Sequence, residues 1–171
     1  MLFLFFISIV YCQNIVKNPS FEKFDSNNKL LHSSISEDVD FSSDSHSGNI
    51  SLHWKPKKKT IFNSQILQVD DGFQYEVCAY IKVIGIAQKM LEGGLMLSFS
   101  SLNTTKEAYQ YSTSRGHYRD IINWKQSCFI TDTIRKSNKN DKYYFGIYSG
   151  TSTEQGEIFV DDVSELIFSL E

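Results

Sequence analysis

The sequence predicts an all-β protein, an antiparallel β-sandwich. Short segments of alternating apolar and polar residues recur along the chain, and many of them are rich in valine, isoleucine, threonine and aromatic residues. Turn signals such as Asp70-Asp71-Gly72 and Lys139-Asn140-Asp141 separate the segments at short intervals. With only two prolines to interrupt central strands, this pattern is typical of a β-sandwich or barrel.

The chain begins with residues 1–12, which we interpret as a secretory signal peptide. The first ten residues are almost all apolar, too short a run to span a bilayer, and polar sequence follows them. No lysine or arginine precedes this run, and a buried first strand is the alternative interpretation. We expect a secreted mature chain, residues 13–171, that folds as one domain and has no membrane span.

Strands are expected wherever alternation and β-branched content coincide. The expected ranges are 15–16, 33–41, 50–54, 59–69, 74–84, 94–101, 109–112, 125–131, 143–148 and 157–168. Residues 84–91 carry the only helical pattern, which Gly93-Gly94 would end.

Alternation predicts two faces for the strand at 74–84. The face expected in the core carries Tyr75, Val77, Ala79, Ile81 and Val83. The opposite face carries Glu76, Cys78, Tyr80 and Lys82. A polar face with an aromatic residue suits either a sugar-binding sheet or an ordinary solvated face.

Cleavage after Cys12 leaves two cysteines, Cys78 and Cys128, each within an expected strand. A disulfide between them is predicted for an oxidising compartment, where it would contribute about 3–4 kcal/mol. Two separate buried thiols are the alternative, and two cysteines alone are too few ligands for a metal site. Asn49-Ile-Ser51 and Asn103-Thr-Thr105 are glycosylation sequons, which agree with secretion.

Five segments, in order, resemble the carbohydrate-binding modules of families four, nine and twenty-two. These are Asn14-Ile-Val-Lys-Asn-Pro-Ser-Phe-Glu22, Asp44-Ser-His-Ser-Gly-Asn-Ile-Ser-Leu52, the strand at 71–82, Trp124 and Phe159-Val-Asp-Asp-Val-Ser-Glu-Leu166. The resemblance covers nearly all of the mature chain and implies a galactose-binding-like jelly roll of two antiparallel sheets.

The same resemblance implies a structural calcium ion where the two ends of the chain meet. The implied ligands are Glu22 and Asp161, with Asp44 and the backbone of Asn49 as further members, since Ca²⁺ takes carboxylate and carbonyl oxygens. Asp162 is the alternative to Asp161, because alternation decides which carboxylate faces the ion. Without an ion, Glu22 would cap a turn and the aspartates would face water.

Carbohydrate ligands need aromatic rings together with polar side chains. The candidate ligand-binding residues are Tyr80, Lys82, Trp54, Tyr109, Tyr111, Arg115 and Tyr118, the last four in a cluster that also holds His117 and Arg119. For Trp54, packing and ligand contact remain equal alternatives. For Trp124 we expect a core position.

No enzyme is predicted. Asp161 and Asp162 are neighbours that alternation turns to opposite faces, so they cannot form the paired carboxylates of a glycosidase. The net charge is −3 and the only basic block is Lys55 to Lys59, which argues against nucleic acid as a partner. The sequence therefore favours a secreted, monomeric, calcium-stabilised carbohydrate-binding protein; the rival is a secreted structural or adhesion domain that binds protein.

Overall fold

The computed structural model describes residues 14–32, 39–55, 60–67, 69–84, 95–102, 110–113, 121–136, 142–149 and 156–168. These residues contain nine strands and no helix. The strands are β1 (Val39–Ser42), β2 (Ser51–Trp54), β3 (Thr60–Leu67), β4 (Gln74–Ile84), β5 (Leu95–Leu102), β6 (Gln110–Thr113), β7 (Ile121–Ile130), β8 (Lys142–Ser149) and β9 (Glu157–Phe168). Within this described part of the chain, no helix is long and apolar enough to cross a membrane.

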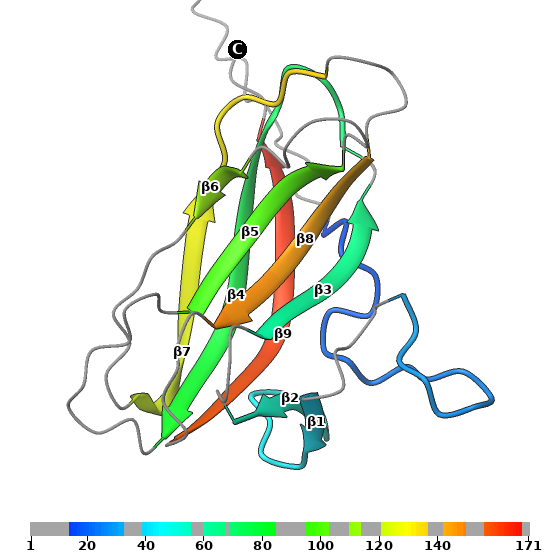
Figure 1. The fold of residues 1–171 in the computed structure, drawn as a ribbon, viewed down its shortest axis with the longest axis vertical. Helices are drawn as coiled ribbons and strands as arrows, with labels where there is room; N and C mark the ends of the chain where they lie inside the picture. The colour runs from blue at the N-terminus through cyan, green and yellow to red at the C-terminus, as the bar shows by residue number, and fades with distance from the viewer. Residues whose placement is uncertain are drawn as a thin grey trace, which may run out of the picture.

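The strands form two antiparallel sheets. One has five strands in the order β1-β2-β9-β4-β7, and the other has four in the order β3-β8-β5-β6. Figure 1 shows the four-stranded sheet lying across β7, β4 and β9 of the five-stranded sheet. The predicted all-β antiparallel sandwich is confirmed.

Most strand boundaries agree with the expectation to within one or two residues. Strand β7 is the main exception, because it begins at Ile121 rather than at residue 125. The expected strand at 33–41 is seen as β1 from Val39 onward, and residues 33–38 lie outside the described ranges. The helical pattern at 84–91 lies almost wholly outside them, and Ile84 itself ends β4.

The predicted strand at Ile15-Val16 is wrong, because this segment is held by side chains instead of a β-ladder. The Asn14 side-chain oxygen accepts a hydrogen bond from the Val16 amide at 3.1 Å, a local turn that competes with an extended backbone. Val16 is nevertheless buried and belongs to the core.

Asn18 organises the turn that follows. Its backbone has a positive φ of 56°, which asparagine tolerates better than most residues. Its buried side chain donates to the carbonyls of Lys23 and Leu31 and accepts from the Lys23 amide. The next residue, Pro19, accepts a hydrogen bond from the Val163 amide at 3.0 Å, so the N-terminal segment lies against β9.

The core lies between the sheets and follows the alternation predicted for β4. Tyr75, Val77, Ala79, Ile81 and Val83 are all buried in one hydrophobic cluster. On the opposite face, Cys78 and Cys128 form a disulfide and are directly paired across β4 and β7. The predicted disulfide is confirmed.

Candidate functional site on the outer face of the five-stranded sheet

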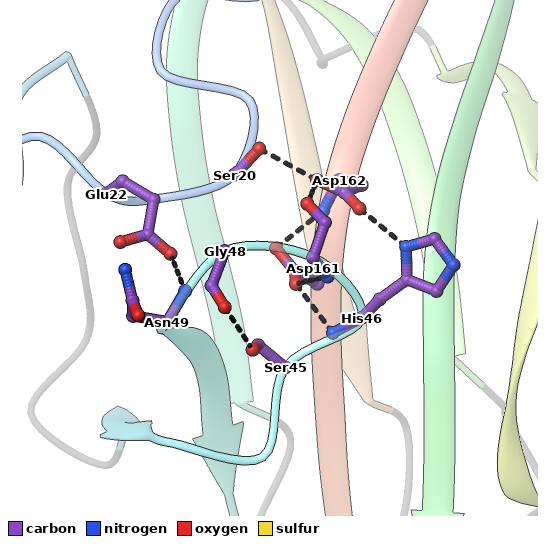
Figure 2. A network of polar contacts seen from close by, with 9 residues as sticks. Ser20, Glu22, Ser45, His46, Gly48, Asn49, Asp161 and Asp162 are labelled. Atoms are coloured by element: carbon purple, nitrogen blue, oxygen red, sulfur yellow. Dashed lines mark hydrogen bonds and ion pairs between the residues drawn. The ribbon is translucent and has the colours of Figure 1, made fainter.

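The candidate site lies where residues 43–50, the loop that joins β1 to β2, meet the outer face of β9 and β4. Three carboxylates from two segments hold this loop: Glu22 of the N-terminal segment, and Asp161 and Asp162 of β9. Figure 2 shows the loop passing between Glu22 on one side and the two aspartates on the other. Glu22 and Asp161, expected at one calcium site, bind the backbone of this loop at different points, Glu22 at Asn49 and Asp161 at His46.

Asp161 is fully buried beneath the loop, with 0% of its surface exposed. Its Oδ2 atom accepts the backbone amides of His46 at 2.8 Å and Ser47 at 3.1 Å. Its Oδ1 atom accepts the amide of Asp162 at 2.8 Å. Three backbone donors therefore compensate part of the cost of burying this carboxylate.

Asp162 contacts the same loop, so the prediction that the two aspartates face opposite sides is wrong. The β4–β9 register shifts between Cys78 and Tyr80, and Asp162 has a positive φ of 45° at this irregularity. Such a bulge interrupts the alternation of side chains. Ser20 and Ser47 each donate a hydroxyl to Asp162 Oδ1 at 2.7 Å, and His46 Nδ1 lies 2.6 Å from Asp162 Oδ2 (Figure 2).

The two aspartates differ in their electrostatics. Burial raises the pKa of Asp161 above its ordinary value, although the amides of Ser47, Asp162 and His46 oppose that shift. Burial also acts to raise the pKa of Asp162, but the hydrogen bonds from His46, Ser47 and Ser20 outweigh it and lower the pKa. Asp162 is therefore held as a carboxylate that can pair with a protonated His46.

Glu22 holds the other end of the loop. Its Oε1 atom accepts the amides of Asn49 at 2.6 Å and Ile50 at 2.8 Å. Gly48 makes this approach possible, because a Cβ atom there would lie only 2.5 Å from Glu22 Oε1. The positive φ of Gly48, 65°, also favours glycine.

The donor set partly fits the predicted calcium ion. Carboxylates of Glu22 and Asp161 and the loop backbone are the ligands that Ca²⁺ prefers. However, Glu22 Oε1 and both oxygens of Asp161 already accept amide hydrogens, so an ion would have to use their remaining lone pairs and the loop carbonyls. Calcium stays a prediction.

Asp44, another predicted metal ligand, pairs with a predicted sugar ligand. Lys82 Nζ donates to Asp44 Oδ2, and the backbone carbonyl of Asp44 accepts the Ser51 hydroxyl at 2.6 Å. The Lys82 ammonium also lies 5.7 Å from the ring centroid of Phe159. Lys82 and Asp44 thus form an ion pair beside an aromatic ring.

Tyr80 lies on the outer face of β4, as predicted, but His46 covers one side of its ring. The two rings stack with centroids 3.5 Å apart and an interplanar angle of 15°. A sugar therefore cannot stack on that side of Tyr80 while His46 remains in place. Asp162 and Tyr80 together fix the His46 imidazole.

Trp124 of β7 completes the group, and its expected core position is wrong. The Trp124 side chain is half-buried on the outer face, with its ring 6.0 Å from His46 and 6.5 Å from Phe159, both edge-to-face. The earlier start of β7 brings Trp124 inside the strand, next to Gln126, which pairs with Tyr80. We call the side chains of His46, Tyr80, Trp124, Lys82 and Asp44 the outer patch.

Trp54 does not belong to this patch. It is 1% exposed and packs in the core at the end of β2, so its assignment as a ligand-binding residue is wrong. Trp54 is in the core because it pairs with Ile158 of β9, another core residue, and lies on the same inward face of the sheet.

The remaining predicted positions fall elsewhere. Tyr109, Arg115 and Tyr118, with His117 and Arg119, lie outside the described ranges, as does the sequon residue Asn103. Tyr111 lies on β6, where the structure describes the backbone alone. Asn49 of the first sequon is exposed. Sequence reasoning missed His46, whose place in the Ser-His-Ser-Gly loop was its only signal.

Comparison with solved structures shows the same fold in carbohydrate-binding modules. A family 16 carbohydrate-binding module has a TM-score of 0.63 at 11% identity, over 89% of this chain and 99% of that one. The xylan-binding domain CBM22-1 from Paenibacillus barcinonensis has a TM-score of 0.56 at 10% identity, over 89% and 93%. The chain therefore has the galactose-binding-like jelly-roll fold that its sequence motifs predicted.

The same fold also occurs outside these modules. A Stig cyclase from Fischerella sp. TAU has a TM-score of 0.58 at 12% identity, over 94% of this chain and 100% of that one. No protein-family model and no curated protein sequence matches the chain. At these identities the comparisons show the fold alone, so function must be argued from the site.

Proposed function

We propose that this protein binds carbohydrate without chemically changing it, and that the outer patch contributes to the binding site. The observation that carries the proposal is the half-buried Trp124, whose ring lies beside those of His46 and Phe159. The ammonium of the Lys82–Asp44 ion pair lies over the same Phe159 ring. An aromatic ring can pack against the C–H face of a sugar, while the carboxylate accepts and the ammonium donates hydrogen bonds to its hydroxyls. The fold shared with carbohydrate-binding modules supports this function.

The carboxylates of the site support a binding role over a hydrolytic one. Asp161 is buried and bonded to three amides, and Asp162 is bonded to His46 and two serine hydroxyls. A glycoside hydrolase needs two carboxyl groups that flank an accessible scissile bond. These two aspartates instead accept hydrogen bonds that hold the loop at 43–50.

The decisive experiment is binding of the purified protein to a glycan array and to a panel of soluble polysaccharides by affinity electrophoresis. Trp124→Ala should abolish or strongly weaken the retardation seen with the wild type, because it removes the stacking surface. Ile122→Ser is the matched control, since Ile122 lies on the same strand, is 66% exposed and is not part of the patch. Lack of binding to every glycan, or equal binding by the wild type and Trp124→Ala, would contradict the proposal.

A protein-binding or adhesion domain is the second candidate, and two exposed side chains favour it. Ile122 and Ile130 are both largely exposed on β7, the last strand of the five-stranded sheet. Exposed aliphatic side chains on an edge strand are suited to a protein partner. In that case Ile122→Ser, and not Trp124→Ala, would reduce capture of the partner.

We further propose that the protein is secreted and that a calcium ion stabilises the meeting point of Glu22, Asp161 and the loop at 43–50. The apolar residues 1–12 and the confirmed disulfide support secretion, since disulfides persist in oxidising compartments. N-terminal sequencing of protein recovered from the medium should begin at Gln13. Recovery of the protein only inside cells, or with residues 1–12 retained, would contradict secretion.

A further inference from the structure

The disulfide on the outer face of β4 and β7 has a carboxylate beside it. Glu76 and Cys78 are two residues apart on β4 and therefore share a face, and Cys128 of β7 is directly paired with Cys78. The ligand atoms of these three residues all lie within 4.8 Å of one another. Among the described residues, they make the one group of three or more histidine, cysteine or acidic side chains that meets this distance.

This arrangement is suited to a metal ion once the two sulfurs are separate thiolates. Zn²⁺ takes thiolate and carboxylate ligands in a tetrahedral geometry, and three protein ligands leave a fourth position open. Two ligands on one strand and a third on its neighbour come from a rigid sheet, which limits the loss of conformational entropy on binding. In the oxidised protein both sulfurs are bonded to each other and cannot serve as thiolates.

We propose that reduction of the Cys78–Cys128 disulfide creates a three-ligand site for a thiophilic divalent cation such as Zn²⁺, formed by Glu76, Cys78 and Cys128. The cross-link between β4 and β7 would then be replaced by a metal link between the same two strands. The site shares no residue with the outer patch, so the proposal does not depend on whether the protein binds carbohydrate.

The two cysteines differ in exposure, and this difference favours attack of a reductant on Cys128. Cys128 is exposed, whereas Cys78 is buried at 3%. A thiolate of a dithiol reductant attacks the Cys128 sulfur, the sulfur–sulfur bond breaks, and Cys78 leaves as a thiolate. The second thiol of the reductant then attacks the mixed disulfide and releases Cys128, so the two electrons come from the dithiol, which becomes a disulfide. Both cysteines are thiols after protonation, and binding of Zn²⁺ displaces their two protons.

The test uses Cd²⁺ as the probe, because Cd²⁺–thiolate bonds absorb in the ultraviolet. The protein carries Cys12→Ser so that no third cysteine contributes, is reduced with a dithiol, and is then freed of reductant under anaerobic conditions. Reduced protein should bind one Cd²⁺ per chain with a thiolate charge-transfer band, and oxidised protein should show no such band. Glu76→Gln should weaken the reduced protein's affinity, whereas Glu157→Gln on β9 should not.

A second pair of variants needs no reductant and so remains informative if reduction unfolds the protein. Cys128→His keeps three ligands and should bind Cd²⁺ in air, whereas Cys128→Ala keeps two and should bind it far more weakly. Absence of the charge-transfer band in both reduced protein and Cys128→His would overturn the proposal. Equal affinities of reduced protein with and without Glu76→Gln would also overturn the three-ligand site, because the cysteines alone would then account for binding.

Discussion

Replacement of Asp161 by alanine tests whether its carboxylate holds the loop at 43–50 onto β9. The substitution removes three hydrogen bonds to a charged, fully buried group, from the amides of His46, Ser47 and Asp162. Hydrogen bonds to charged groups contribute about 1.5–3 kcal/mol each, which gives a gross loss of roughly 4.5–9 kcal/mol.

The net loss should be smaller, for two reasons. Burial raises the pKa of Asp161, so the charged carboxylate is itself destabilised, and alanine removes that penalty. The loop can also move so that its freed amides bond to water. We therefore expect Asp161→Ala to lower the free energy of unfolding by about 2–4 kcal/mol.

Urea unfolding at neutral pH, followed by circular dichroism and tryptophan fluorescence, measures this loss. Asp161→Asn is the matched control, because its side-chain oxygen can still accept amide hydrogens, and it should lose less than the alanine variant. A change in the free energy of unfolding within about 0.5 kcal/mol for Asp161→Ala, the range of ordinary surface substitutions, would refute the reasoning.

Three further predictions concern Asp162, the proposed calcium ion and the two tryptophans. Hydrogen bonds lower the pKa of Asp162, so its stabilising contribution is present above the unfolded-state pKa of about 3.9 and is lost as pH falls through the lower folded-state value. Asp162→Asn, in which asparagine tolerates the positive φ, should therefore destabilise the protein at pH 6 and make its free energy of unfolding less sensitive to acid. An acid profile identical to that of the wild type would contradict this. At a free calcium concentration of about 100 times the dissociation constant, removal of the proposed ion by a chelator should lower the free energy of unfolding by about 2.7 kcal/mol. Glu22→Gln should reduce that effect. A melting temperature that does not respond to chelator would exclude the ion. Trp54→Ala should cost about 3–5 kcal/mol because it empties a core position, whereas Trp124→Ala should cost clearly less because that ring is half-buried; equal losses in urea unfolding would contradict the two placements.

Much of the fold could be predicted because its signals are local. Alternation in β4 identifies its core face residue by residue, and β9 begins and ends at the expected residues. Turn residues and β-branched content likewise mark most of the other strands. Side chains on a regular strand alternate strictly, so a pattern with a period of two is sufficient where the strand is regular.

The candidate site could be predicted only in part, because its geometry departs from regular structure. The sequence indicated that Glu22 and Asp161 lie at residues 44–49, and each binds the backbone of that loop, at different residues. It did not indicate that Asp162 turns to the same loop, because a β-bulge and a positive φ break the alternation there. The segment at Ile15-Val16 also departs from the expected strand, since the Asn14 side chain accepts the Val16 amide hydrogen in place of a ladder partner.

The sequence predicted the fold, whereas tertiary structure decided where the two tryptophans lie. The sequence by itself predicted an all-β sandwich and a disulfide between Cys78 and Cys128, and its resemblance to a known family implied that the two ends meet. Tertiary structure alone decided that Trp54 packs in the core and Trp124 lies on the outer face beside His46 and Phe159. The physical reason is that hydrophobicity and alternation indicate only that a side chain prefers to be buried. The face of the sheet on which a ring lies depends on where its strand begins, on the register of that strand and on the loop that covers the face.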